Sequence, residues 1–255
     1  MSLSTKTVMV TGGLGGIGQP LVRLLVENGA RVTVSDYQPN ASVDRAQYIY
    51  ADLRDTASID ALCKVVAAET PDILVNLAGL NAFCKFSEQS STNINDMITV
   101  NLTSMMLLSR AALPSMIQRN HGQIVNIGSV VGSIGLPHFT VYAATKAGVK
   151  GFSEALRREL NGSGVSVTHI APRAVRTPMN QGSIDRFNEL SKTAVDSPEN
   201  VAARILRAIE HKESNVTIGF PEKLFVKINA LWPGVVDGPL NKNRKIGETI
   251  LAELS

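Results

Sequence analysis

A phenol and an ammonium group stand four residues apart in the stretch YAATKAG, where small residues surround Tyr142 and Lys146. The alanines favour a helix, in which a spacing of four places both side chains on one face. A cation about 4 Å from the phenol, in an effective dielectric of about 20, favours the phenolate by roughly 4 kcal/mol. That is about three pK units, which would bring the tyrosine close to neutral pH, where a proton donor or acceptor works best. The same spacing also occurs by chance on solvated helix faces, so the pair needs support from the rest of the chain.

A glycine-rich stretch, VTGGLGGIG, lies between the first β-branched run and the first helical pattern. Two dinucleotide-binding frames fit it: GxGxxG at Gly13, Gly15 and Gly18, and TGxxxGxG at Gly12, Gly16 and Gly18. Either frame predicts a tight turn whose backbone N–H groups approach a pyrophosphate at the amino end of a helix. The expected dinucleotide contacts are Gly12, Gly15, Gly16, Ile17 and Gly18.

Asp36 ends the second β-branched run, RVTVSD. A carboxylate at this position accepts hydrogen bonds from the hydroxyls of an adenosine ribose. A 2′-phosphate would meet like charge there, and neither Leu14, Gly15 nor Tyr37 supplies a cation. The sequence therefore predicts a preference for NAD(H) over NADP(H).

Short β-branched runs alternate with longer helical patterns from Thr7 to Ala171. This alternation predicts βαβ units, hence an α/β fold: a Rossmann-type, doubly wound parallel sheet in three α/β/α layers. The runs are apolar throughout, as burial on both faces of a sheet requires. No linker-like segment interrupts the pattern, so we expect a single domain over residues 1–255.

Beyond the sixth strand the pattern becomes irregular. Residues 172–197 are rich in Pro, Gly and polar residues and are expected to form a substrate loop with one short helix near 184–191. Ser197 and Pro198 resemble a helix start. A C-terminal extension near 220–255 carries an apolar helix face that we expect to pack on the domain or on a neighbouring subunit, with a membrane or acyl-chain contact as the alternative: Leu224, Phe225, Ile228, Leu231 and Trp232.

Composition limits the classes of partner. The chain has 255 residues, 44% of them hydrophobic, and a net charge of +3 spread without a basic run, so no nucleic-acid partner is expected. Neither a secretory signal nor a transmembrane span is predicted. Cys63 and Cys84 form no CxxC or Cys/His cluster, which indicates neither a disulfide framework nor a metal site. A cytoplasmic location fits best.

Further motifs complete a family pattern: Asp52, NLAG at 76–79, Asn101 and Ser129 precede Tyr142 and Lys146 in order and spacing. With them the chain resembles the short-chain dehydrogenase/reductase family over about its first 200 residues. The resemblance implies that Tyr142 is the acid/base and that the Ser129 hydroxyl binds the substrate oxygen. It also implies that Lys146 lowers the Tyr142 pKa and holds the nicotinamide ribose.

The resemblance adds further expectations, each with a plainer alternative. It implies that Asn101 holds a water molecule that relays protons to Lys146. The alternative is that Asn101 is a buried amide hydrogen-bonded to the backbone. Asp52 is expected beside the adenine, or as a turn cap, and Thr11 is expected to be structural. The remaining implied cofactor contacts, besides Tyr142 and Lys146, are Leu53, Asn76, Ala78, Gly79, Pro172 and Thr177. Family members commonly pair through two long helices, here near 93–119 and 140–161, which implies a homodimer or homotetramer.

The substrate side departs from the family pattern at Arg173, where glycine usually follows the proline. One hypothesis is that Arg173 binds an anionic group of the substrate; the alternative is that it points to solvent. Val131, His138 and Phe139, together with the 178–195 segment, are candidate walls of the substrate pocket.

These observations predict an NAD(H)-dependent oxidoreductase that interconverts a secondary alcohol and a ketone, with the hydride supplied by the cofactor. One alternative is a 3-oxoacyl thioester reductase, in which Arg119, Arg157 and Arg158 could help an acidic carrier to dock. Another is a dinucleotide-binding regulator without catalysis. The sequence leaves open the substrate, the stereochemistry and the direction of the reaction.

Overall fold

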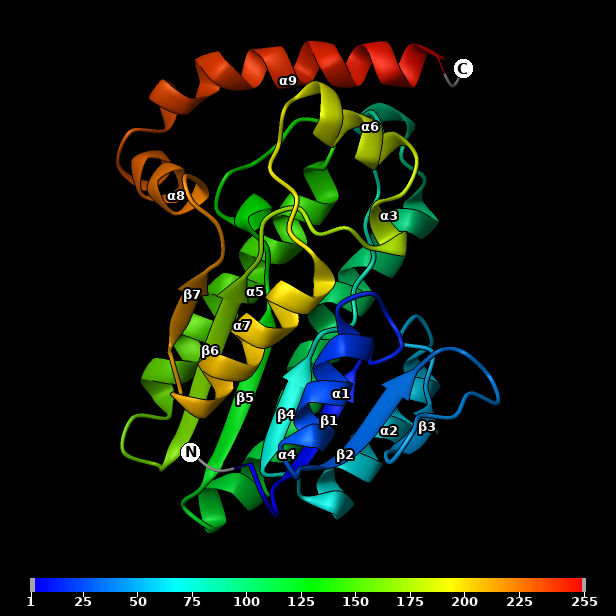
Figure 1. Cartoon of the computed structure of the whole chain (residues 1–255), viewed down its shortest axis with the longest axis vertical. Helices are drawn as coiled ribbons and strands as arrows, with labels where there is room; N and C mark the ends of the chain where they lie inside the picture. The colour runs from blue at the N-terminus through cyan, green and yellow to red at the C-terminus, as the bar shows by residue number, and fades with distance from the viewer. Residues whose placement is uncertain (1–2, 254–255) are drawn as a thin grey trace.

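A computed structural model describes residues 3–253 as a parallel sheet with helices on both faces (Figure 1). The strand order is β3-β2-β1-β4-β5-β6-β7. All neighbouring strands are parallel, which confirms the predicted Rossmann-type, doubly wound sheet. The strands are β1 Thr7–Thr11, β2 Arg31–Asp36, β3 Gln47–Tyr50, β4 Ile73–Asn76, β5 Gly122–Ile127, β6 Val165–Ala171 and β7 Asn215–Thr217.

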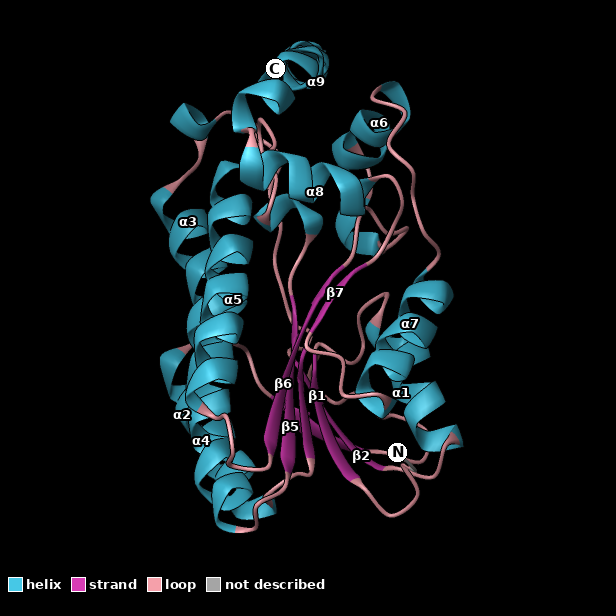
Figure 2. Cartoon of the chain, turned by 90° about the vertical axis from the view of Figure 1, so that its left-hand side faces the viewer, coloured by secondary structure: helices cyan, strands magenta, loops and turns pink. Residues whose placement is uncertain are grey.

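The helices form a layer on each face of the sheet (Figure 2). One face is covered by α1 (Gly18–Glu27) and α7 (Pro198–Glu210), and the other by α2 (Thr56–Glu69), α4 (Ser104–Gln118) and α5 (Thr140–Glu159). The central strands β1, β4 and β5 are buried almost throughout, because each layer packs its own apolar core against them. The three-layer arrangement is therefore as predicted.

Local sequence signals account for several helix boundaries. Ser197 caps α7 by accepting a hydrogen bond from the Asn200 amide, and Pro198 occupies its first turn, as predicted. The short helix α6 (Ser183–Leu190) lies in the predicted substrate loop. Short 3₁₀ helices occupy Phe86–Glu88, Val130–Gly132 and Pro178–Asn180.

The predicted long helix at 93–119 is interrupted. The chain forms α3 (Ser91–Ile98), then a π-helical turn (Thr99–Thr103), then α4. Such a turn inserts an extra residue into the helix and is frequent at functional sites. Here it contains Asn101.

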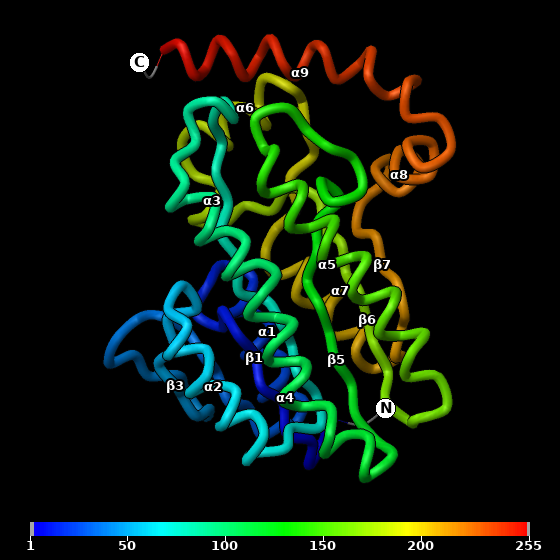
Figure 3. Tube along the Cα trace, turned by 180° about the vertical axis from the view of Figure 1, so that it is seen from behind, coloured from blue at the N-terminus to red at the C-terminus, as the bar shows by residue number. Residues whose placement is uncertain are grey.

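The C-terminal extension forms α8 (Glu222–Leu231) and α9 (Pro233–Glu253), and α9 lies across the end of the molecule where the strands end (Figures 1 and 3). Its last two residues lie outside the described range. Of the residues predicted to form the apolar face of α8, Ile228 packs beside Val130 and Val236. The others stay 46 to 67% exposed: Leu224, Phe225, Leu231 and Trp232. Packing of these four on a neighbouring subunit remains a prediction.

None of the helices within residues 3–253 combines the length and the apolar character that a membrane span requires.

Candidate active site

The glycine-rich turn follows β1. The order of the strands reverses at β1, because β2 lies on one side of it and β4 on the other. Dinucleotides bind at such a switch point. Gly12 has φ +70°, and a Cβ there would lie 2.7 Å from Ala78 Cα. A Cβ on Gly18 would lie 2.3 Å from the Gly12 carbonyl oxygen. The turn is therefore folded so tightly that no side chain fits at Gly12 or Gly18, which is consistent with the close approach of a pyrophosphate.

The loop after β6 faces this turn. A Cβ on Gly16 would lie 2.6 Å from Thr177 Cγ2, so the two segments are in contact. The Pro172 carbonyl accepts a hydrogen bond from the Val130 amide, which joins this loop to the segment after β5. Pro172, Thr177 and the glycine turn thus lie together at the carboxyl ends of the strands, and their contact with a cofactor stays a prediction.

Asp36 anchors the glycine turn. Its buried carboxylate accepts hydrogen bonds from the backbone N–H groups of Leu14 (2.9 Å) and Tyr37 (2.8 Å). Each carboxylate oxygen retains capacity for a second hydrogen bond. Asp36 can therefore hold the turn and still receive a ribose hydroxyl.

Asp52 lies after β3 and is paired with a cation that sequence analysis overlooked. Arg54 Nη2 lies 2.7 Å from Asp52 Oδ2, and this hydrogen bond holds the pKa of Asp52 below its usual value. Asp52 also caps a turn by accepting from the Arg54 amide. The Arg54 guanidinium lies 6.0 Å from the centre of the Tyr37 ring. The Leu53 side chain is buried in the core, so only its backbone is left for a cofactor.

The NLAG motif splits into two roles. The Asn76 amide donates to Ser109 Oγ (3.2 Å) and to Asn126 Oδ1 (2.8 Å), so the side chain is engaged in the core beneath α4 and serves structure. Thr11, structural as predicted, accepts from the amide of Ala78. A Cβ on Gly79 would lie 3.5 Å from Lys146 Nζ, which places this glycine beside the catalytic candidates.

The structure gathers Ser129, Tyr142 and Lys146. The Ser129 hydroxyl lies close enough to that of Tyr142 to lower the pKa of the phenol, and it accepts from the Val131 amide at 3.2 Å. Lys146 Nζ donates to the carbonyl of Ile127 at 3.0 Å and lies 5.7 Å from the centre of the Tyr142 ring. Two hydroxyls and an ammonium group thus converge where β5 and α5 meet.

The predicted decrease in the Tyr142 pKa is wrong for this arrangement. Burial raises the pKa of Tyr142, and only the neighbouring Ser129 hydroxyl opposes this shift. The Lys146 ammonium group donates to the Ile127 carbonyl and lies 5.7 Å from the centre of the ring, so it is not hydrogen-bonded to the phenol. Burial instead lowers the pKa of Lys146 to about 8. The lysine is thus the group poised to change charge in mildly alkaline solution.

The buried ammonium group predicts a stability effect. Between the folded pKa of about 8 and the ordinary value of 10.5, the unfolded chain binds more protons, so this contribution to stability rises with pH. Below pH 8 the charge is buried in the folded state at a cost of about 3 kcal/mol. Lys146→Met should therefore raise the free energy of unfolding at pH 7 by up to about 3 kcal/mol. It should also abolish the increase in the free energy of unfolding between pH 8 and 10. Urea unfolding at several pH values measures both effects, and the control Lys150→Met, one turn away, should keep the increase with pH.

Asn101 acts as a clamp. Its Oδ1 accepts from the Leu80 amide at 2.6 Å, while Nδ2 donates to the Leu80 carbonyl (2.9 Å) and to Thr145 Oγ1 (3.0 Å). A Cβ on Gly79 would lie 3.3 Å from Asn101 Oδ1. The π-helical turn thus aims the amide at the loop after β4 and at α5. These contacts match the alternative expectation, that Asn101 is a buried amide hydrogen-bonded to the backbone.

Arg173 neither points to solvent nor lacks a partner: its side chain is only 17% exposed and is paired with carboxylates, which gives no support to the hypothesis that it binds an anionic substrate. Its guanidinium makes two hydrogen bonds to Asp196 (3.0 and 2.8 Å) and one to Glu222 (3.2 Å). Two carboxylates outweigh its single positive charge. Arg173 instead ties the loop after β6 to the end of the 172–197 segment and to the start of α8.

Arg173→Ala should destabilise the protein by about 2 to 3 kcal/mol, because two partly buried carboxylates lose their cation. A melting temperature about 5 to 10 °C lower is expected for a chain of this size. Arg176→Ala, at an exposed neighbour, is the matched control. A change in preference between charged and neutral ketones would restore the substrate-binding hypothesis.

His138 and Val131 lie on the substrate side, but in different roles. His138 Nε2 lies 3.1 Å from the Arg244 carbonyl of α9, so this histidine supports the C-terminal helix. Val131 packs with Tyr142 in an apolar cluster, together with the predicted wall residue Phe139. Sequence analysis missed Phe83 and the α9 residues of the same cluster; the i, i+4 spacing of Ile246 and Ile250 was the available signal.

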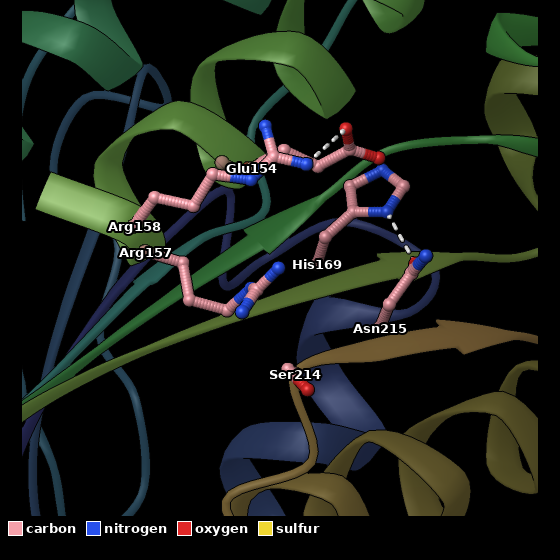
Figure 4. Close-up of a pocket in the computed structure, with 7 residues that line it drawn as sticks. Glu154, Arg157, Arg158, His169, Ser214 and Asn215 are labelled. Carbon is pink, nitrogen blue, oxygen red and sulfur yellow. Dashed lines mark hydrogen bonds and ion pairs between the residues drawn. The ribbon is translucent and has the colours of Figure 1, made fainter. Parts of the chain in front are cut away.

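The predicted carrier-docking arginines lie far from this site. Arg157 is about 22 Å along α5 from Tyr142, by the rise of an α-helix. Arg157 and Arg158 border a cavity of about 130 Å³ beside β7, where Arg158 pairs with Glu154 and His169 with Asn215 (Figure 4). Arg119 is bound to the backbone carbonyls of Thr70, Pro71 and His121. These arginines therefore give no support to docking beside the reacting groups.

Comparisons with known proteins agree on one family. Residues 6–187 match the family model described as short chain dehydrogenase. The 3-oxoacyl-[acyl-carrier-protein] reductase FabG of Vibrio harveyi is 36% identical over 194 residues, which are 72% of this chain and 80% of that protein. The ketoacyl reductase HetN of Nostoc is 32% identical over 256 residues, covering 92% of this chain and 88% of that protein. A solved short-chain dehydrogenase from Sphingobium yanoikuyae in complex with NADPH is 25% identical, with a TM-score of 0.77 over 91% of this chain and 95% of that one.

Proposed function

The chain belongs to the short-chain dehydrogenase family, and on this premise we propose that it interconverts a secondary alcohol and a ketone with NAD(H). As a family member it is an oxidoreductase that acts on CH–OH groups with a nicotinamide cofactor. The observation that supports the proposal most is the convergence of Ser129, Tyr142 and Lys146 beside the loop after β4, which itself contacts the glycine turn at Gly12.

In the proposed mechanism the Tyr142 hydroxyl gives a proton to the ketone oxygen, or takes one from the alcohol. The Ser129 hydroxyl, which lies beside that of Tyr142, holds the same oxygen where charge develops. Lys146, with its pKa lowered to about 8, can take up or release a proton near the operating pH. Asn101 positions the loop after β4 beside the lysine. When bound, the nicotinamide supplies or accepts the hydride.

The glycine turn fits the cofactor. Backbone atoms of Ala78 and Gly12 lie where a Cβ on Gly12 or Gly18 would be, so only glycine at these two positions allows this fold of the turn. We assign the pyrophosphate to Gly12, Gly15, Gly16, Ile17 and Gly18, the ribose to Asp36, and further contacts to Asp52, Leu53, Ala78, Gly79, Pro172 and Thr177.

The proposed preference for NAD(H) rests on Asp36, whose carboxylate would repel a 2′-phosphate. Two observations favour NADP(H) instead. Arg54 lies over Tyr37 near the same position, and the Sphingobium enzyme was solved with NADPH. Asp52 pairs with Arg54 at 2.7 Å and partly neutralises the positive charge of Arg54. We therefore retain the preference for NAD(H).

A second candidate is a 3-oxoacyl thioester reductase, favoured by the printed names of the Vibrio and Nostoc relatives. Both candidates reduce a ketone at the same residues and differ in what the ketone is attached to. The non-catalytic regulator fits poorly, because Tyr142, Lys146 and Ser129 are all retained and gathered. A cytoplasmic homo-oligomer, paired through α4 and α5, is proposed from the family resemblance alone.

The deciding experiment is a fluorescence-monitored screen of secondary alcohols, simple ketones and 3-oxoacyl thioesters with all four forms of NAD(H) and NADP(H). Turnover of simple ketones with NADH is the expected result. Turnover of the thioester alone with NADPH would select the second candidate, and binding of a cofactor without any turnover would contradict both.

A further inference from the structure

The C-terminal extension carries a dense patch of exposed apolar side chains. Thirteen large hydrophobic side chains are exposed within residues 3–253, and six of them lie between residues 220 and 235. Single exposed apolar residues need no explanation, but a cluster of them marks an interaction site. We call these six residues the apolar patch, and they are 46 to 78% exposed: Phe220, Leu224, Phe225, Leu231, Trp232 and Val235.

Contacts on one side of α8 fix this helix to the domain. Val226 and Ile228 pack there in an apolar cluster, and the Asn229 side chain donates a hydrogen bond to the Ser133 carbonyl at 2.8 Å. α8 lies on the outer side of the molecule and faces the viewer in Figure 2. The remaining side chains of α8 are therefore presented outward on a fixed helix.

The outer face of α8 combines leucines with lysine. Leu224, Lys227 and Leu231 recur at i, i+3 and i+7, so they share one face of the helix. Asn229 comes two residues after Lys227, a rotation of about 200°, so this face points away from the domain. Trp232 follows directly at the end of α8. Apolar and cationic side chains are thus mixed on a surface that the domain does not cover.

The charge around the apolar patch is positive. Residues 220–245 carry five cationic side chains and two carboxylates. One of these carboxylates, Glu222, already pairs with Arg173. Four of the cations are exposed and have no ion pair within the part of the chain that the structure describes: Lys223, Lys227, Lys242 and Lys245.

These charges distinguish the two occupants expected from the sequence, a neighbouring subunit and a membrane. In a twofold contact with a second copy, the patch would meet itself, so Lys223 and Lys227 would face lysines of like charge. An anionic lipid surface offers the opposite charge, which attracts lysines close to it. Trp, Phe and Leu beside lysines are also the side chains by which amphipathic helices bind the headgroup region. Charge and residue type thus favour lipid.

We propose that α8 and the start of α9 form a peripheral docking surface for an anionic lipid bilayer. The apolar patch enters the boundary between headgroups and acyl chains, and Lys223 and Lys227 bind the lipid phosphates. This inference goes beyond the proposed reaction and does not depend on it, because no residue of the apolar patch belongs to the glycine turn or to the candidate catalytic groups.

The chain's single tryptophan, Trp232, lies in the apolar patch and reports directly on docking. Full-length protein is titrated with vesicles of phosphatidylglycerol and phosphatidylcholine in equal parts, and with vesicles of phosphatidylcholine alone. The anionic vesicles should move the Trp232 emission to shorter wavelength, and brominated acyl chains should quench it, because the indole leaves water. The affinity should be at least about tenfold higher for the anionic vesicles and should fall as salt is added.

The contribution of the lysines is measured by sedimentation with the same vesicles. Lys223→Gln combined with Lys227→Gln should lower the affinity for anionic vesicles at least about tenfold, since each lysine near such a surface contributes about fivefold. The matched control combines Lys64→Gln with Lys192→Gln, which removes the same charge from two other exposed positions. This control should bind like the wild type.

The contribution of the apolar patch is measured in the same way. Leu231→Ser combined with Trp232→Ser should abolish sedimentation with the vesicles, because both side chains lose their apolar contact with lipid. Phe86→Ser combined with Leu190→Ser is the control, since these apolar side chains are 58% and 48% exposed outside the patch. Circular dichroism and the melting temperature establish that each variant is folded.

Binding that requires anionic lipid and is lost in both patch variants, but not in the controls, supports the inference. Equal affinity for neutral vesicles, equal binding by all variants, or no emission shift with either kind of vesicle overturns it. A shift that follows protein concentration without vesicles, together with a dimer that Leu231→Ser and Trp232→Ser disrupt, would assign the patch to a second copy instead. None of these measurements involves turnover, so failure of the proposed function would leave the result unchanged.

Discussion

Tyr142→Phe is expected to lower kcat by about 10² to 10⁴-fold, the usual contribution of general acid–base catalysis. The substitution removes only the hydroxyl that Ser129 contacts and leaves the ring against Phe139. The affinity for NADH should stay within about threefold, because the glycine turn and Asp36 are untouched. Steady-state kinetics and a fluorescence titration with NADH measure the two quantities.

Tyr50→Phe is the matched control. This tyrosine ends β3 with 55% of its surface exposed, and the variant should keep the wild-type kcat. A Tyr142→Phe variant that binds NADH normally and turns over every accepted substrate at the wild-type rate would remove Tyr142 from the mechanism.

Gly18→Ala is expected to weaken cofactor binding at least about 100-fold, or nearly 3 kcal/mol. The new methyl group would lie 2.3 Å from the Gly12 carbonyl oxygen and 2.7 Å from Gly13 Cα, both rigid backbone atoms. The first turn of α1 must therefore move away from the glycine turn, and the N–H groups at its amino end move with it. A fluorescence titration with NADH gives the affinity, and circular dichroism establishes that the variant is folded.

Gly135→Ala is the control, since a Cβ there has no atom within 4 Å and should leave the affinity unchanged. If folded Gly18→Ala protein binds NADH as tightly as the wild type, the pyrophosphate does not lie at this turn.

The catalytic groups show where sequence reasoning reached its limit. The spacing of Tyr142 and Lys146 correctly predicted one helix face, because the period of a helix is local. It did not predict the direction of the pKa shifts. Desolvation depends on every segment packed around a group, and the Lys146 ammonium found the carbonyl of Ile127, nineteen residues away in the chain.

Arg173 and Asn101 show the same limit for long polar side chains. The partners of Arg173 lie 23 and 49 residues away, and those of Asn101 lie 21 and 44 residues away. No local pattern reports contacts of this range. The sequence marked both residues as unusual, but only packing showed that they clamp segments together.

By itself, the sequence determined the parallel sheet, the glycine turn, the position of Asp36 at the end of β2 and the shared helix face of Tyr142 and Lys146. Each follows from apolar periodicity, turn chemistry or residue spacing within one βα unit. Only the tertiary structure decided which charges are neutralised and that α9 covers the apolar side chains beside Tyr142. Those outcomes depend on which distant segments exclude water from one another, and that is a property of the packed chain as a whole.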